Sequence, residues 1–208
     1  MAEYLHIHPK NPEERKIRQV VDALQNGALI IYPTDTLYAI GCDILAPKAI
    51  ERLARIKKID PAKANFSIMC ADLSHISEYA HRIDQSVFRI MKKALPGPYT
   101  FILEATNQVP KLLSNKKKTI GIRIPDNQIC CELIEKLGRP IITSSLHADD
   151  AIQEYPTDPD EINEQFSKLV DIIIDGGPGG IVPSTILNCL NGTIEVTRQG
   201  AGSLEILN

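Results

Sequence analysis

No apolar run in the sequence approaches the length of a membrane span, and the first ten residues, Met1 to Lys10, lack the apolar core of a signal peptide. The chain also lacks a strong excess of one charge. Its formal net charge of -3 excludes a histone-like basic coat but leaves room for a local basic cleft. We therefore expect a cytoplasmic protein with no membrane partner.

Paired cysteines are missing as well. The five cysteines are odd in number and scattered, and none has the CxxC spacing typical of a zinc site. Free cysteine behaves as a small hydrophobic residue. We expect reduced, mostly buried thiols and no metal ligands among them.

What the sequence does contain is the balance of an ordinary globular fold. Of its 208 residues, 43% are hydrophobic and 24% are charged, with 14 prolines and 12 glycines spread along the chain. There is no repeat, low-complexity tract or long linker. This length suits one large domain over residues 1–208.

Helical and strand patterns alternate along the chain, which predicts an α/β fold with a mixed, twisted sheet. Helices are expected over 12–25, 47–58, 73–79, 84–94, 131–137 and 159–166, with Asn11 capping the first. Strands are expected over 28–32, 66–70, 99–103, 119–124, 141–144, 170–174, 185–189 and 193–197. Residues 33–42 are expected to form an irregular loop, and Asn191-Gly192 a tight hairpin turn.

Several widespread catalytic motifs are absent. The sequence has no GxGxxG, GxxxxGK[ST], GxSxG or HExxH, so dinucleotide, P-loop, hydrolase-elbow and zinc-protease mechanisms have no support. The remaining polar signals are short and lie at strand ends and turns, where open α/β sheets bind ligands.

Each of these signals also has a structural interpretation. The segment from Pro33 to Tyr38 offers hydroxyls and a carboxylate for a site, but the same residues suit a side-chain-stabilised turn. Lys57, Lys58 and Lys63 could bind phosphate or could serve a helix end and a solvated loop.

Strand alternation groups some of the polar residues. Thr119 and Arg123 share one face of a strand, so both could point into one cleft, where an inward arginine requires an anion. Thr143 and Ser145 likewise share a face at the end of an apolar strand.

In this order, the polar segments resemble the YrdC/YciO family, whose better-known members make L-threonylcarbamoyl-AMP for the threonylcarbamoyladenosine modification of tRNA. The resemblance covers nearly the whole chain, and the ordered set of segments is more specific than any one of them. The matching segments are Pro33 to Tyr38 through Gly41-Cys42, Pro96 to Phe101, Thr119 to Pro125, Thr143 to Ser145, Pro183 to Thr185, and Arg198 to Gly200.

This resemblance implies a single domain with a twisted mixed β-sheet flanked by helices, and a concave, positively charged cleft that binds ATP and threonine. The family's reaction condenses L-threonine, bicarbonate and ATP, with magnesium spreading the triphosphate charge. Arg123 would pair with the threonine carboxylate as a bidentate fork.

The other roles implied by the resemblance are divided between the two substrates. Thr34, Thr143 and Ser184 would help to hold threonine. Thr119, Ser145 and Arg198 would contact ATP, while Lys57 and Lys63 would reach its phosphates. Lys57 and Ser145 would therefore lie nearest the reacting groups.

Two positions depart from the pattern of the better-known synthases. Those enzymes carry Lys-x-Arg and Ser-x-Asn where this chain has Lys57-Lys58-Ile59 and Ser145-Leu146-His147. A lysine nearby cannot replace the planar fork of arginine. These departures place the chain nearer the YciO branch.

Three functional hypotheses remain open at this stage. The first is a threonylcarbamoyl-AMP synthase with weak or altered activity. The second is a paralogue that binds tRNA, double-stranded RNA or a nucleotide without synthase activity, with the basic run Lys116 to Lys118 either contacting RNA or forming a solvated turn. The third is an adenylating enzyme for another small amine or acid.

Overall fold

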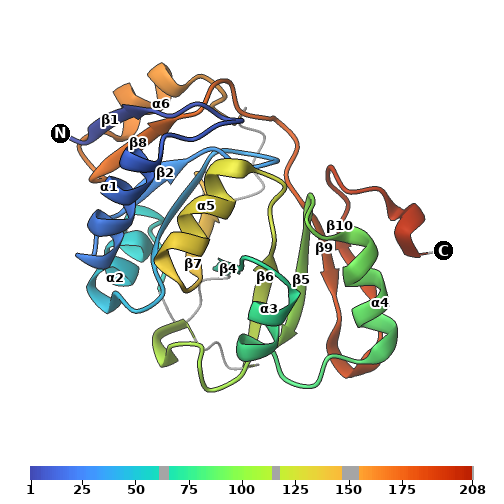
Figure 1. The fold of residues 1–208 in the computed structure, drawn as a ribbon. Helices are drawn as coiled ribbons and strands as arrows, with labels where there is room; N and C mark the ends of the chain where they lie inside the picture. Colours follow the sequence, from blue (N-terminus) through green and yellow to red (C-terminus); the bar gives the residue numbers. More distant parts are fainter. Residues whose placement is uncertain (61–65, 114–117, 147–154, 208) are drawn as a thin grey trace.

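The computed structural model describes residues 1–60, 66–113, 118–146 and 155–207. Within these residues the strands form one ten-stranded sheet in the order β1-β8-β2-β3-β7-β4-β6-β5-β9-β10 (Figure 1). The strands are β1 (Glu3–His6), β2 (Ile30–Tyr32), β3 (Ala39–Asp43), β4 (Ser67–Met69), β5 (Tyr99–Glu104), β6 (Thr119–Arg123), β7 (Ile141–Ser145), β8 (Ile172–Asp175), β9 (Thr185–Asn188) and β10 (Glu195–Arg198).

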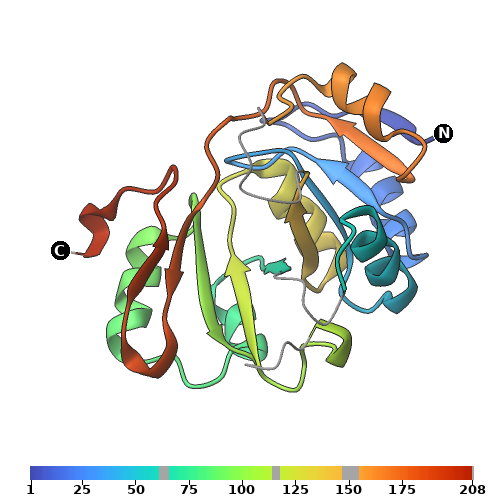
Figure 2. The same ribbon diagram turned by 180° about the vertical axis from the view of Figure 1, so that it is seen from behind.

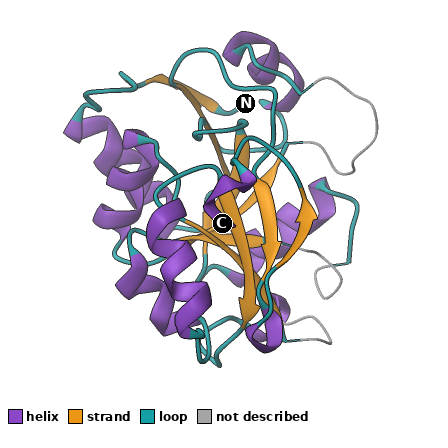
Figure 3. Cartoon of the chain, turned by 90° about the vertical axis from the view of Figure 1, so that its right-hand side faces the viewer, coloured by secondary structure: helices purple, strands orange, loops and turns teal. Residues whose placement is uncertain are grey.

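The helices pack along this sheet rather than forming a separate unit (Figures 2 and 3). They are α1 (Glu14–Gln25), α2 (Pro47–Ile56), α3 (Leu73–Tyr79), α4 (Gln85–Ala94), α5 (Gln128–Leu137) and α6 (Pro159–Phe166), with short 3-10 turns η2 (Lys111–Leu113), η3 (Leu190–Gly192) and η4 (Leu204–Leu207). The predicted α/β domain with a twisted mixed sheet and flanking helices is confirmed.

The sheet is mixed because distant segments add to it in both directions. β1 pairs in parallel with β8, and β5 pairs in parallel with β9. β3 instead lies antiparallel between β2 and β7. The strand order therefore brings residues from the start, middle and end of the chain onto one surface.

The two faces of the sheet pack against different helices. On one face, Ile31, Ile40 and Ile142 belong to a large core cluster that includes residues of α2, α3 and α4. On the other, Ile141 and Met69 pack with apolar residues of α1 and α5 in a second cluster. Because side chains alternate along a strand, the polar residues two positions from Ile141 and Met69 share the second face.

Most element boundaries agree with the sequence prediction, but the expected loop over 33–42 is wrong in its second half. Ala39–Asp43 is a fully buried strand. Its glycine and small side chains gave no strand pattern, yet pairing on both sides satisfies its backbone groups. The prediction also missed β1, whose side chains are mostly exposed. Its one partly buried apolar residue, Leu5, alternates only with Ile7, which lies beyond the end of the strand.

Two helices start at residues other than the predicted ones. α1 begins at Glu14 rather than Pro12, and the predicted Asn11 cap is wrong: the N-cap is Glu13, which makes no side-chain cap hydrogen bond. The backbone N–H groups of Lys10 and Asn11 instead donate to His8 Nδ1 in a preceding turn. α5 begins at Gln128 because the Asn127 side chain caps the helix by accepting from the Cys130 N–H.

The prediction for Asn191-Gly192 is right in its backbone angles and wrong in the tightness of the turn. The two residues have the expected positive φ values, 56° and 71°, but a longer connection with the 3-10 segment η3 joins β9 to β10. Four of the five cysteines are buried, and Cys131 is half-buried. No helix among the described residues is both long and apolar enough to cross a bilayer.

Candidate functional site

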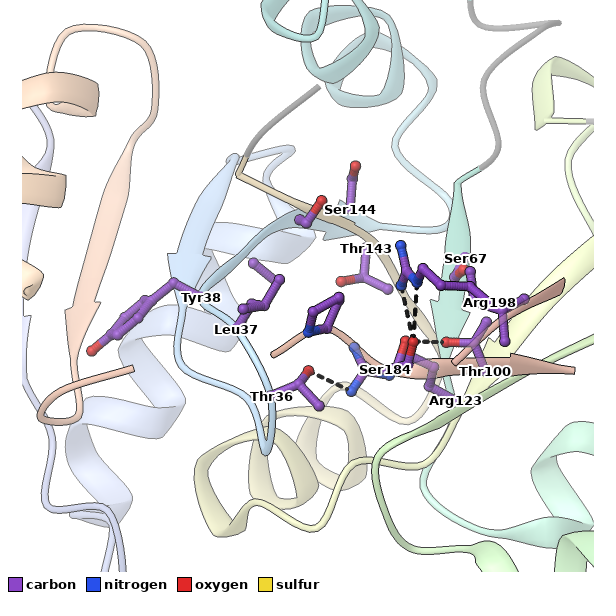
Figure 4. A pocket seen from close by; sticks show the side chains of 14 residues that line it. Thr36, Leu37, Tyr38, Ser67, Thr100, Arg123, Thr143, Ser144, Ser184 and Arg198 are labelled. Carbon is purple, nitrogen blue, oxygen red and sulfur yellow. Dashed lines mark hydrogen bonds between the residues drawn. The ribbon is translucent and has the colours of Figure 1, made fainter. Parts of the chain in front are cut away.

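A cavity opens on the second face of the sheet, beyond the part covered by α1 and α5 (Figure 4). We call it the hydroxyl cavity because serine and threonine side chains dominate its wall. It is lined by Thr36, Leu37, Tyr38, Ala39, Ser67, Thr100, Arg123, Thr143, Ser144, Ser145, Pro183, Ser184, Ile186 and Arg198.

Strand alternation produces this polar wall. Thr143 and Ser145 lie on the same face of β7 as the core residue Ile141, and Ser67 on the same face of β4 as Met69. Each strand thus passes from an apolar residue under the helices to a hydroxyl in the cavity. The glycine opposite Ser67 makes room for it: a Cβ at Gly121 would lie 2.4 Å from Ser67 Oγ.

The turn before β3 is held by a chain of hydroxyl hydrogen bonds. Thr34 Oγ1 donates to the Leu37 carbonyl at 2.7 Å and accepts from the Thr36 backbone N–H. Because the single Thr34 hydroxyl hydrogen is used there, Thr36 Oγ1 is the donor in the 3.1 Å contact between the two hydroxyls. Thr34 therefore stabilises the turn, as in the structural interpretation, and Thr36 is the threonine that lines the cavity.

Arg123 extends from the end of β6 into the wall of the cavity and is only 9% exposed. Its Nη2 donates to Asp35 Oδ1 at 2.7 Å and to Thr36 Oγ1 at 3.0 Å. These bonds use both Nη2 hydrogens. The anion that an inward arginine requires is thus supplied inside the protein by Asp35.

The Asp35–Arg123 ion pair is incompletely satisfied. Asp35 Oδ2 and Arg123 Nε are buried and have no hydrogen-bond partner within the described residues. Burial raises the pKa of the Asp35 carboxyl, and the Arg123 guanidinium opposes that rise by favouring the charged form.

Hydroxyls on both sides of the cavity are oriented by buried partners. The fully buried Tyr32 donates its hydroxyl to Thr143 Oγ1 at 2.8 Å, which leaves the Thr143 hydrogen available for another acceptor. Burial raises the pKa of Tyr32 well above its usual value, so the phenol keeps its proton. Across the cavity, Ser184 Oγ lies 2.8 Å from Thr100 Oγ1.

Arg198 lies at the end of the edge strand β10, after an irregularity in the pairing with β9. Its Nε and Nη2 both donate to the Ser184 carbonyl, at 3.2 and 3.0 Å. Figure 4 shows this fork beside the Ser184–Thr100 contact, with Arg123 on the neighbouring wall. The structure therefore brings Arg123, Thr143, Ser145, Ser184 and Arg198 together around one cavity.

Lys57 reaches the same region from the end of α2. The residue is 4% exposed, and its Nζ donates to the Ser145 carbonyl at 2.6 Å. Two residues further on, Ile59 is 37% exposed. Lys63, His147 and the Lys116-Lys117 part of the basic run lie outside the described residues. The predicted positive charge of the cleft stays a prediction.

Thr119 is separated from the hydroxyl cavity. It lines a second cavity, together with His81, Arg82, Asp84, Leu103, Glu104, Cys189, Leu190 and Asn191. Thr119 and Arg123 lie at the two ends of β6, about 13 Å apart along a strand. The alternation argument correctly put them on one strand face, but the structure places them in different cavities.

Four serine and threonine residues of the cavity were given no site role from the sequence: Thr36, Ser67, Thr100 and Ser144. Thr36 and Thr100 lie inside segments that carry the family resemblance, and the alternation of Thr100 with the buried residue Phe101 could have placed it on the polar face. Ser67 begins a three-residue strand, so its own segment gives no comparable signal.

The described residues do not offer a protein-built metal site: no group of three or more His, Cys, Asp or Glu side chains among them is placed to hold an ion. The cavity instead presents hydroxyl and guanidinium donors on a mixed sheet. These features define a mixed α/β protein with a polar cavity at its strand ends, of a kind that suits a small anionic or carboxylate-bearing ligand.

Comparison with known proteins identifies the family. Residues 22–200 match the family model Sua5_yciO_yrdC, described as "Telomere recombination". The chain belongs to this Sua5/YciO/YrdC family, and the resemblance predicted from its motifs is confirmed. The family includes relatives that are named threonylcarbamoyl-AMP synthases.

Full-length similarity extends to the uncharacterized protein YciO of Escherichia coli (strain K12), which is 43% identical over 206 residues, covering 99% of this chain and 98% of that protein. The crystal structure of E. coli YciO matches with a TM-score of 0.92 and 41% identity over 100% of both chains.

A putative threonylcarbamoyl-AMP synthase of Methanocaldococcus jannaschii is 36% identical over 201 residues, 94% of this chain and 92% of that protein. The structure of Pyrococcus abyssi Sua5 complexed with L-threonine matches with a TM-score of 0.88 and 28% identity, covering 97% of this chain and 58% of that one.

Proposed function

We propose that this protein is an L-threonylcarbamoyl-AMP synthase of the Sua5/YrdC type, with weak or altered activity. The observation that carries the proposal is the buried Arg123 at a cavity whose wall is otherwise built largely from hydroxyls. A guanidinium beside several hydroxyl donors suits a hydroxylated amino acid. The L-threonine complex of the related Sua5 supports this substrate class.

The reaction joins three anionic or carboxylate-bearing reactants. The threonine nitrogen forms a bond to the carbon of bicarbonate with loss of water, and a carbamate oxygen then attacks the α-phosphorus of ATP while pyrophosphate leaves. Such chemistry needs fixed donors and cations rather than a protein nucleophile.

Residues that line the cavity, together with the neighbouring Lys57, supply these groups. Arg123 binds the threonine carboxylate, while Thr143 and Ser184 donate to the same substrate. Ser145, Arg198 and Lys57 bind the nucleotide, with Lys57 held at the strand end by its bond to the Ser145 carbonyl. Because both Nη2 hydrogens of Arg123 are already used, its remaining donors are Nη1 and Nε, so a bidentate fork would have to share Nη2 with Asp35 or Thr36.

Magnesium fits this site as an ion carried by the nucleotide. Asp35 is the carboxylate beside Arg123 and is engaged with it, whereas magnesium commonly combines substrate phosphates with water and one or two carboxylates. When bound, the ion spreads the charge of the triphosphate. The protein residues then have to orient the nucleotide and the carbamate.

The proposal is tested by pyrophosphate release from magnesium-ATP and bicarbonate, measured with and without L-threonine. We expect release only when all three substrates are present, together with a product of the mass of threonylcarbamoyl-AMP. A panel of other amino acids serves as the control. Release with another amino acid but not threonine would indicate a different adenylating enzyme, and no release with any of them would contradict the proposal.

Ile59 offers a gain-of-function test. Restoring the arginine found in the better-known synthases, as Ile59→Arg, should add a donor two residues after Lys57 and raise the threonine-dependent rate. A single well-placed donor to a charged transition state typically raises kcat by about 10²–10³-fold. This range is the upper bound for the gain in rate. We expect an increase of roughly tenfold or more in pyrophosphate release.

The matched control is Ile59→Gln, which removes the same half-exposed apolar side chain without adding charge. It should leave the rate unchanged. Equal rates for the arginine and glutamine variants would mean that the phosphates do not approach this position.

A further inference from the structure

Asp35 occupies an unusual position for a residue beside a site that takes anions. Its carboxylate contacts Arg123 at 2.7 Å, and the side chains of the two residues are only 7% and 11% exposed. Asp35 does not itself line the hydroxyl cavity. It therefore acts on a ligand through the guanidinium rather than by direct contact.

We propose that Asp35 is a specificity-determining residue that makes the Arg123 subsite accept a carboxylate and reject phosphate. The inference rests on the proposed function and concerns the same site. On this proposal, Asp35 is what lets the subsite distinguish the amino-acid carboxylate from the phosphate groups of the nucleotide. An arginine alone can bind either anion in the same bidentate geometry.

The net charge of the Asp35–Arg123 pair is what distinguishes a carboxylate from a phosphate. The guanidinium and the Asp35 carboxylate together are neutral, so an incoming anion is attracted by one and repelled by the other. A phosphate group carries about -1.5 to -2 charges at neutral pH, against one for a carboxylate. A zwitterionic amino acid, moreover, brings an ammonium group that the Asp35 charge attracts.

Burial makes this charge effective. Interactions between exposed charges are screened by water and salt, whereas those between buried groups are screened much less. Thr36 also holds Arg123 Nη2 at 3.0 Å, so the guanidinium cannot turn away from Asp35 without breaking a second hydrogen bond. Asp35 thus sets the net charge beside the ligand. Together with Thr36 it also fixes the direction in which the remaining Arg123 donors, Nη1 and Nε, point.

Two further cations, Arg198 and Lys57, are the ones assigned to the nucleotide. Arg198 lines the cavity while donating to the neutral carbonyl of Ser184, and Lys57 donates to the neutral carbonyl of Ser145. Repulsion from Asp35 would direct the phosphates toward this side, so that the two substrates bind in one orientation.

The experiment is a titration with inorganic phosphate of the wild-type protein and of Asp35→Asn, by calorimetry and in competition with L-threonine. Asparagine preserves the size of the side chain and an acceptor for Arg123 Nη2, but removes the charge. We expect phosphate to bind Asp35→Asn at least about tenfold more tightly than wild type, and the ratio of phosphate to threonine affinity to rise.

Two variants complete the test. Asp35→Glu keeps the charge and should continue to exclude phosphate. Asp22→Asn changes the net charge of the chain by the same amount at an exposed position on α1 and should behave as wild type. Thermal melting checks that each variant is folded.

Unchanged phosphate affinity in folded Asp35→Asn would overturn the inference, and so would an equal gain in Asp22→Asn. The proposed function fails separately, if wild type binds no L-threonine. In that case the direct phosphate titration of Asp35→Asn still decides the role of Asp35, because it does not depend on the amino acid.

Discussion

Replacing Arg123 by alanine should raise the apparent threonine requirement by at least about 30-fold while leaving ATP binding largely intact. Truncating one partner of a buried, hydrogen-bonded charge pair typically costs roughly 2–5 kcal/mol in binding. Arg123 is the guanidinium assigned to the threonine carboxylate, whereas the nucleotide is assigned to Arg198, Ser145 and Lys57. The measurement is the KM for threonine beside the affinity for ATP.

Loss of binding has to be separated from loss of folding in this variant. Arg123→Ala leaves the buried Asp35 carboxylate without its cation, which costs about 3–5 kcal/mol of stability. The double variant Arg123→Ala with Asp35→Asn removes that charge as well. It should recover much of the thermal stability but none of the threonine affinity.

A second buried pair provides the matched control. Arg139 donates through Nε and Nη2 to the buried carboxylate of Asp43, away from the residues that line the cavity. Arg139→Ala should therefore lower the melting temperature without changing the KM for threonine. Parallel loss of threonine and ATP binding in Arg123→Ala, matched by Arg139→Ala, would identify Arg123 as a structural arginine.

Among glycine-to-alanine substitutions in the strands that support the cavity, Gly41→Ala should lower the free energy of unfolding the most. A Cβ at this position in β3 would lie 2.3 Å from the Ile142 carbonyl oxygen and 2.9 Å from the Tyr32 hydroxyl. Both neighbours are buried in the sheet, so neither has space to move. Overpacking typically costs about 1–3 kcal/mol, and we expect this clash with a main-chain oxygen to lie at the upper end, about 3 kcal/mol.

The expected result is a fall in melting temperature of roughly 6–12 °C, by the usual scaling for a chain of this length. Because Tyr32 donates to Thr143, its displacement should also weaken threonine binding. Gly27→Ala is the matched control: its Cβ meets nothing within 4 Å, but its φ of +84° makes alanine strained by about 1–2 kcal/mol. A loss in Gly41→Ala no greater than in Gly27→Ala would contradict the crowding argument.

Much of the fold could be predicted because long apolar runs and turn residues mark most of its elements. α3 and α6 lie at the predicted residues, and α4 begins within one residue of its predicted start. β3 escaped prediction because Gly41 and Cys42 carry no strand signal, and only pairing with β2 and β7 makes the segment a strand. Tertiary context decided that element, as it commonly does for short strands.

The candidate site was predictable where hydroxyls end a strand and unpredictable where residues meet across the sheet. Alternation along β7 placed Thr143 and Ser145 on one face, and the structure puts both in the cavity wall. The ion-pair partner of Arg123, in contrast, could not be predicted from the sequence. Asp35 lies 88 positions away in sequence, and nothing local indicates that the two charges are buried together.

The order of strands has a consequence for synthesis of the chain on the ribosome. Glu3 of β1 pairs with Ile172 of β8, and the cavity takes residues from Thr36 to Arg198. Such long-range parallel pairing closes large loops and forms slowly. The first strand must therefore emerge long before its neighbour exists, with its backbone edge unpaired and open to association with other chains. Ligand binding should appear only when almost the entire chain has been released, which makes binding a late reporter of folding.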